Sequence, residues 1–293
     1  MEEQRYYTNL YELSPPYPLS LLQVLKNQLQ LGKRYVVMEV HTHNGQWSKL
    51  LHKHVHRMCS LCTDPVYQVY LQEQFADSDH FLSLNALPEM TSIDDDSIDC
   101  LCIDATFHHY DPERMRVEFE RIMRLNSYVL IAQHERSATS GSFTEAYGQW
   151  LEEHGKITAK TILPDRTQLE RFYPNAYQRK IFESQQRLNW DQLRAYALTH
   201  LEQFGRQADD QSLSALRLLY HDHVSNGQVV LDYHTHIYYG IFNHTVEKIP
   251  WYQTFLFTLL RPFAFVLYLL LKARIYVGKG LKRFWRWLTP QSK

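Results

Sequence analysis

The chain has 293 residues and a formal net charge of −1 at pH 7. Hydrophobic residues make up 44% and charged residues 22% of the composition, which supports a sizeable core and argues against intrinsic disorder. The charge is uneven, because residues 249–293 hold eight Lys or Arg and no Asp or Glu, which leaves −9 for residues 1–248. A main domain this acidic argues against a nucleic-acid partner, which requires a basic face.

The first residues, Met1 to Arg5, are charged and lack the apolar core of a signal peptide. We therefore expect a cytoplasmic main domain, and four cysteines fit that reducing setting. The spacings C-x-x-C (Cys59, Cys62) and C-x-C (Cys100, Cys102) raise a zinc site as one interpretation. Both pairs fall within predicted strands, so we favour buried thiols that pack as small hydrophobic groups.

Residues 36–47 predict a buried strand, a tight turn and the start of a helix. At such a junction in a doubly wound sheet, glycines allow the backbone to approach a nucleotide cofactor and to adopt positive φ. Here His41 and His43 stand at two of the positions where glycine is expected. An imidazole there would occupy the space of the ligand.

The segment Glu39-Val40-His41-Thr42-His43-Asn44-Gly45 resembles the acidic residue and G-x-G-x-G turn of class I S-adenosylmethionine-dependent methyltransferases, especially the small-molecule group related to trans-aconitate methyltransferase. Asp64, after a second predicted strand, matches the acid that holds the ribose hydroxyls, although it could equally be a turn residue before Pro65. The resemblance covers roughly residues 30–245, one domain by its length. It implies a Rossmann-like α/β fold of the class I methyltransferase type. The implied cofactor contacts are Glu39, His41, His43, Gly45, Asp64, Asn85 and Asp104.

Later segments continue the resemblance. Residues 93–103 resemble the loop and strand before the catalytic pocket, 119–124 a helix, 124–127 the turn after it, and 128–132 the next strand. Leu188-Asn189-Trp190 and 232–240 resemble the C-terminal cap and the final strands. If the protein is an enzyme, the resemblance implies that His108, His109 or Tyr110 orients or deprotonates the substrate.

Sixteen histidines raise a metal hypothesis. Residues His41, His43, His108, His109 and His134 follow the first, fourth and fifth strands, which are neighbours in the resembled fold. Because a set of imidazoles without known geometry is weak evidence for a metal, we predict none. We interpret His234-Thr235-His236 as alternating between the faces of a strand, so that both imidazoles do not point one way.

The C-terminal segment 249–293 combines an apolar run, Trp251 to Leu271, with a basic amphipathic stretch. The run is long enough to cross a bilayer, but Arg261 and Pro262 interrupt its centre. Crossing would also put the basic residues on the far side, against the positive-inside rule. We therefore expect 249–293 to be a helical membrane-binding tail that dips into or lies on the surface. The alternative is a helical pair packed on this domain or on a dimer partner.

We interpret the chain as a methyltransferase-like domain, 1–248, followed by the tail, 249–293. The leading hypothesis is a membrane-associated methyltransferase-like protein with a degraded or repurposed S-adenosylmethionine site, bound to the inner face of a membrane. One alternative is an active S-adenosylmethionine-dependent methyltransferase on a lipid-soluble small molecule. Another is a non-catalytic scaffold that recruits a partner enzyme to the membrane.

Overall fold

The computed structural model describes residues 8–9, 11–40, 45–104, 111–158, 163–173 and 175–242. Several predicted features lie outside these residues: His41, His43, His108, His109, Tyr110, the domain boundary after residue 248 and the tail 249–293. They remain predictions.

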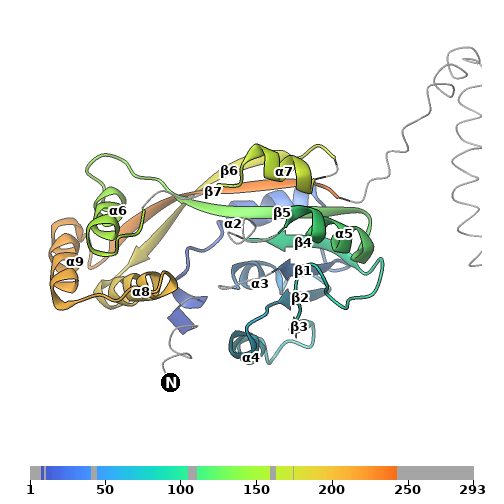
Figure 1. Ribbon diagram of the computed structural model, residues 1–293, viewed down its shortest axis with the longest axis horizontal. Helices are drawn as coiled ribbons and strands as arrows, with labels where there is room; N and C mark the ends of the chain where they lie inside the picture. The colour runs from blue at the N-terminus through green and yellow to red at the C-terminus, as the bar shows by residue number, and fades with distance from the viewer. Residues whose placement is uncertain are drawn as a thin grey trace, which may run out of the picture. The chain divides into compact units, whose positions relative to one another are not determined.

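Seven strands form one sheet in the order β3-β2-β1-β4-β5-β7-β6 (Figure 1). Strands β1 to β5 run parallel, whereas β7 runs antiparallel to both of its neighbours, β5 and β6. The strands are β1 (Val36–Val40), β2 (Arg57–Leu61), β3 (Phe81–Leu84), β4 (Ile98–Ile103), β5 (Met123–Arg136), β6 (Gln178–Leu188) and β7 (Val229–Ile241). The predicted Rossmann-like topology, with the first, fourth and fifth strands adjacent, is confirmed.

Helices connect the strands, and most of them begin at a residue whose side chain caps the first turn. Asp64 and Asp111 each precede a proline and accept hydrogen bonds from backbone amides of the first turn. Asp165 and Asn189 each form a capping box with a glutamine three residues on. The helices are α2 (Leu19–Gln28), α3 (Gln46–Leu51), α4 (Pro65–Gln74), α5 (Pro112–Ile122), α6 (Phe143–His154), α7 (Arg166–Phe172), α8 (Trp190–Gln203) and α9 (Asp210–His223).

Apolar side chains cover both faces of the sheet. On one face, Met38, Leu101 and Val129 pack with Phe119 of α5 and Phe172 of α7. On the other, Val37, Cys100 and Leu130 pack with Leu25 of α2 and Trp47 of α3. The central strands β1 and β4 are therefore buried on both sides, as is usual for parallel strands.

The long strands β5, β6 and β7 reach beyond the parallel strands, and α6, α8 and α9 lie at that end of the sheet (Figure 1). A third apolar cluster forms there from Tyr147, Leu193, Leu216 and Leu231, among others. The four cysteines are all buried, in agreement with their interpretation as packing residues.

The boundary between α5 and β5 differs from the prediction. The helix predicted over 119–124 ends at Ile122, and β5 begins at Met123 and runs through the expected turn. The strand is irregular where the turn was expected: Asn126 has φ of 62°, and the pairing register between β4 and β5 shifts between Ile98 and Cys100. Met123 is fully buried in the core, which favours its early entry into the sheet.

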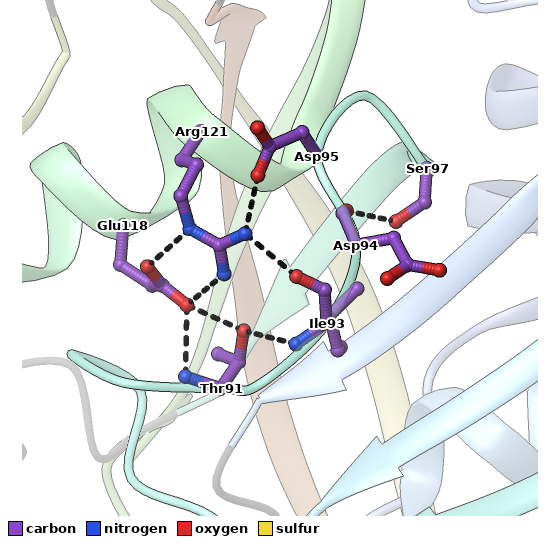
Figure 2. A network of polar contacts seen from close by, with 7 residues as sticks. All are labelled: Thr91, Ile93, Asp94, Asp95, Ser97, Glu118 and Arg121. Carbon is purple, nitrogen blue, oxygen red and sulfur yellow. Dashed lines mark hydrogen bonds and ion pairs between the residues drawn. The ribbon is translucent and has the colours of Figure 1, made fainter.

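A network of polar contacts fixes the loop before β4 to α5 (Figure 2). Glu118 accepts hydrogen bonds from the Thr91 amide (2.8 Å) and hydroxyl (2.6 Å), and from Arg121 (2.7 and 2.9 Å). Arg121 also donates to Asp95 (2.6 Å) and to the Ile93 carbonyl (2.7 Å). Burial would raise the pKa of Glu118, but Arg121 and Thr91 together lower it to about 2. The carboxylate therefore stays charged in the folded protein.

Candidate functional site

The parallel strands end together along one edge of the sheet. Val40 of β1 pairs with Leu61 of β2 and Ile103 of β4, and Leu61 pairs with Leu84 of β3. The predicted residues Asn85 and Asp104 directly follow two of these strand ends. Asn85 is exposed, whereas Asp104 is only 4% exposed. The register thus brings the predicted cofactor contacts to one edge, where ligands bind in open α/β sheets.

Glu39, the acidic residue of the turn motif, holds the start of α3. Its two carboxylate oxygens each accept from a backbone amide, those of Trp47 and Ser48, at 3.1 Å. The Ser48 hydroxyl donates to it as well, at 2.5 Å. Glu39 is completely buried, so these bonds replace water around a charge at the positive end of a helix. This carboxylate therefore positions the start of α3 after the turn.

Gly45 supplies the backbone conformation that the turn needs. It has φ of 59° and precedes α3 as its N-cap. This left-handed conformation strains residues with a Cβ, which accounts for the glycine at this position. The strand and the helix predicted from residues 36–47 are confirmed, whereas the turn residues 41–44 between them lie outside the described residues.

Asp64 lies at the start of α4, three residues after the end of β2. Its Oδ1 atom accepts hydrogen bonds from the Val66 amide (2.9 Å) and the Tyr67 amide (3.1 Å). The residue that directly follows β2 is Cys62, whose buried thiol has its pKa raised to about 11 by burial. Capping of α4 is the role that these contacts give Asp64, and ribose binding remains a prediction.

An N-terminal segment, residues 11–17, contacts this edge of the sheet. The Tyr11 carbonyl accepts from Gln46 Nε2 (3.1 Å) and from Lys49 Nζ, both on α3. Lys49 Nζ also lies 3.6 Å from the centroid of the Tyr11 ring. A Cβ built on Gly45 would be only 3.0 Å from that ring and 3.1 Å from Leu71. The chain's own aromatic ring therefore packs against the glycine of the turn.

The same segment ends at Tyr17, which lies between two further rings. Tyr17 contacts Trp47 of α3 with ring centroids 4.4 Å apart and stacks on His134 of β5 at 5.0 Å. Burial raises the pKa of Tyr17, and the charges of Asp104 and Glu39 raise it further. Tyr17 therefore lies within electrostatic reach of Glu39 and Asp104, two of the three acids of the predicted site. The sequence analysis did not predict this path, because helical or strand periodicity gives no signal for it.

The interpretation of His234-Thr235-His236 was wrong. Residues two apart in a strand share a face, and the rings of His234 and His236 lie on one side with centroids 6.5 Å apart. His236 is 2% exposed, receives a hydrogen bond from Arg179 at Nδ1 (2.6 Å) and contacts Glu135 through Nε2 (2.8 Å). Burial is the largest cause of its lowered pKa. With Arg179 donating to Nδ1, a neutral ring carries its proton on Nε2 and donates it to Glu135.

In the described part of the chain, no group of three or more His, Cys, Asp or Glu side chains is arranged to hold a metal ion. Over the same residues, no helix is both long enough and apolar enough to cross a membrane.

Solved structures of methyltransferases have this fold. A protein from Anaeromyxobacter dehalogenans classed as a type II methyltransferase matches with a TM-score of 0.51 at 15% identity, over 78% of this chain and 98% of its own. A geranyl diphosphate C-methyltransferase from Streptomyces coelicolor, in complex with Mg²⁺, geranyl diphosphate and S-adenosyl-L-homocysteine, matches with a TM-score of 0.44 at 11% identity, over 76% and 77%. No protein-family model and no curated protein matches the chain. Together with the strand order, the first match shows a class I methyltransferase fold and nothing narrower.

Proposed function

We propose that the protein is a membrane-associated methyltransferase-like protein whose S-adenosylmethionine site has been repurposed. The observation that carries the proposal is the contact between Tyr11 and Gly45, where the glycine that would admit a ligand meets a ring of the chain itself. Two imidazoles, His41 and His43, replace the other glycines of the same turn. Each feature reduces the room for a cofactor at this turn.

The hydrogen bonds of the N-terminal segment also support the proposal. Its attachment uses the Gln46 amide and the Lys49 ammonium, which is half-buried. Burial lowers the pKa of Lys49 to about 8, and Glu12 partly opposes that effect. A cofactor at this turn would compete with the Tyr11 carbonyl for the donors of α3.

An active methyltransferase is the second candidate, because the scaffold of the turn is intact. Glu39 is bonded to α3, Gly45 keeps its positive φ, and Asp104 lies buried at the end of β4. In that case the N-terminal segment would be a lid that moves when the cofactor binds, and catalysis would depend on bringing cofactor and nucleophile together.

Calorimetric titration of S-adenosylmethionine into the full-length protein separates these functions. For a repurposed site we expect no binding tighter than about 1 mM, which is near −4 kcal/mol. The variant His41→Gly with His43→Gly tests the imidazoles, and Tyr11→Ala tests the N-terminal segment. A micromolar dissociation constant for the unchanged protein would establish a working cofactor site and overturn the proposal. Vesicle flotation of the same protein tests its membrane association.

A further inference from the structure

The strand β6 forms one edge of the sheet. All 11 of its residues pair with β7, which lies on one side of it. Among the described residues, no further backbone segment forms a hydrogen bond with β6. Its outer side therefore offers a row of backbone N–H and C=O groups to which another strand can be added.

The side chains of β6 alternate between an exposed face and a covered face of the sheet. The covered face holds the half-buried residues Lys180, Phe182 and Ser184. The exposed face holds Arg179, Ile181, Glu183, Gln185 and Arg187. On that face the side chain of Ile181 is 53% exposed. An apolar side chain at this place in a long edge strand favours pairing with a further strand.

Charges of opposite sign flank Ile181. Arg179 lies two residues before it and Glu183 two residues after it, so all three side chains share the exposed face. One guanidinium nitrogen of Arg179 lies 2.6 Å from His236 Nδ1, which leaves other N–H donors of that group for an acceptor. Glu183 forms no ion pair with the cations of the described ranges. The strand is therefore complementary to itself: turned end for end, it places Ile181 opposite Ile181 and each Glu183 opposite Arg179.

Symmetry limits how two copies of β6 can pair. A two-fold axis perpendicular to the sheet keeps the exposed faces of both copies on the same side, and it passes beside one residue that meets itself. With the axis at Glu183, like charges would face each other. With the axis at Gln185, Glu183 would meet Arg187, but the residue at the axis is a polar one that already bonds Asp232 at 2.9 Å. The axis at Ile181 joins opposite charges and also buries an exposed apolar side chain.

We propose that the protein forms a symmetric dimer in which the β6 strands of two copies pair antiparallel about Ile181 and join the two sheets into one. The two Ile181 side chains pack on each other, and an Arg179–Glu183 pair closes on either side of them. On the covered face, the alkyl chain of each Lys180 lies across the ring of Phe182 of the second copy. The dimer goes beyond the proposed function and does not depend on whether the methyl-donor cofactor binds.

Sedimentation of the full-length chain in a non-ionic detergent, over a range of protein concentrations, measures the dimer. We expect Glu183→Arg and Arg179→Glu each to weaken it about tenfold, because each variant alone places like charges opposite each other at two positions. In a mixed dimer of the two variants both pairs have opposite charges, so an equimolar mixture should recover the affinity of the unchanged protein. Glu73→Arg is the matched control, because this exposed glutamate lies on α4, which contacts the other edge strand, β3. Thermal unfolding shows whether each variant folds.

Cross-linking tests the register without changing a charge. Because residues directly opposite in an antiparallel pair have Cα atoms about 4.5–5.5 Å apart, a cysteine at the axis can form a disulfide with its symmetry mate. The four native cysteines are buried and do not compete. Under mild oxidation, Ile181→Cys should cross-link about tenfold faster than Gln185→Cys, which is exposed on the same strand but lies away from its symmetry mate.

The proposal is overturned if the full-length chain stays monomeric at every concentration. It is also overturned if folded charge variants dimerise as tightly as the unchanged protein, which is the result that a dimer held by residues 249–293 would give, or if mixing the two variants restores nothing. Cross-linking of Gln185→Cys as fast as Ile181→Cys would place the contact elsewhere and reject the register.

Discussion

The ring of Tyr11 lies against Gly45, so close that a Cβ on the glycine would be 3.0 Å from it. Gly45 also has φ of 59°, which strains any residue with a Cβ. Two effects thus oppose a side chain at this position, one from the backbone and one from the N-terminal segment. The packing of residues 11–17 therefore requires a glycine at this position of the turn motif.

We predict that Gly45→Ala destabilises the protein by about 1–3 kcal/mol for the backbone alone, and by more because the methyl group meets Tyr11. Urea unfolding of the variant and the unchanged protein measures the loss. The matched control is Gly141→Ala, because Gly141 has φ of 77° but nothing within 4 Å of its added Cβ. If Gly141→Ala costs as much as Gly45→Ala, the packing of Tyr11 contributes nothing.

A second prediction concerns the buried carboxylate of Glu39. In Glu39→Gln one oxygen becomes an NH₂ group that faces a backbone amide of α3, so a donor meets a donor. Since hydrogen bonds to charged groups contribute about 1.5–3 kcal/mol, we expect a loss of that size in the free energy of unfolding. Chemical denaturation measures it, with the exposed Glu73→Gln expected within about 0.5 kcal/mol of the unchanged protein. Equal effects from the two changes would show that Glu39 does not hold α3.

The segment 36–47 and the family resemblance predicted the strand order and the first strand and helix. The sequence also carries local signals for helix starts, which the sequence analysis did not use. The pairs Asp64-Pro65 and Asp111-Pro112 begin helices through side-chain capping, which needs no knowledge of the rest of the chain. The path of residues 11–17 was not predictable in this way, because Tyr11 and Tyr17 are fixed by Gly45, Trp47 and His134, which are distant in sequence. The long β5 strand was also missed, since its extension beyond Ala132 is stabilised by pairing with β7.

The functional residues were likewise predicted only in part. The residues at the strand ends followed from the turn motif and the resemblance, but the sequence analysis assigned no role to Tyr147, Tyr196 and Tyr233. The Tyr147 and Tyr196 rings lie 6.0 Å apart, and the Tyr196 and Tyr233 hydroxyl oxygens 3.2 Å apart, because α6, α8 and β7 meet at that end of the sheet. Abundant tyrosine in a sequence predicts core packing just as well, so composition could not reveal these contacts.

A third prediction concerns acid stability and the network of Figure 2. The pKa of Glu118 is about 2 in the folded protein and 4.5 as the ordinary value. Because the folded pKa is the lower one, Glu118 contributes stability that is fully present above about pH 4.5 and is lost as the pH falls toward 2. Urea unfolding at several pH values should show this loss. Glu118→Gln should be less stable at pH 7 and show a flatter acid dependence.

Thr91→Val serves as the companion change in that experiment. It removes one hydroxyl donor to Glu118 while keeping the shape of the side chain, so the folded pKa of Glu118 should rise. The loss of stability should still begin near pH 4.5, but it should be smaller in total and complete at a higher pH than in the unchanged protein. If Glu118→Gln has the same acid dependence as the unchanged protein, other carboxylates control acid unfolding.

The last prediction concerns the tail, 249–293, and follows from the sequence. Deleting it should release a membrane-bound protein into the soluble fraction and leave the main domain folded, because the apolar and basic residues are concentrated after Glu247. Each basic residue near an anionic surface contributes about 1 kcal/mol. Changing Lys279, Lys282, Arg283 and Arg286 to Glu should therefore weaken binding to anionic vesicles, whereas high salt should weaken the unchanged protein only partly, since apolar insertion remains. Fractionation and vesicle flotation of the three proteins measure this. A full-length chain that stays soluble without detergent would make the tail a packing or dimerisation element.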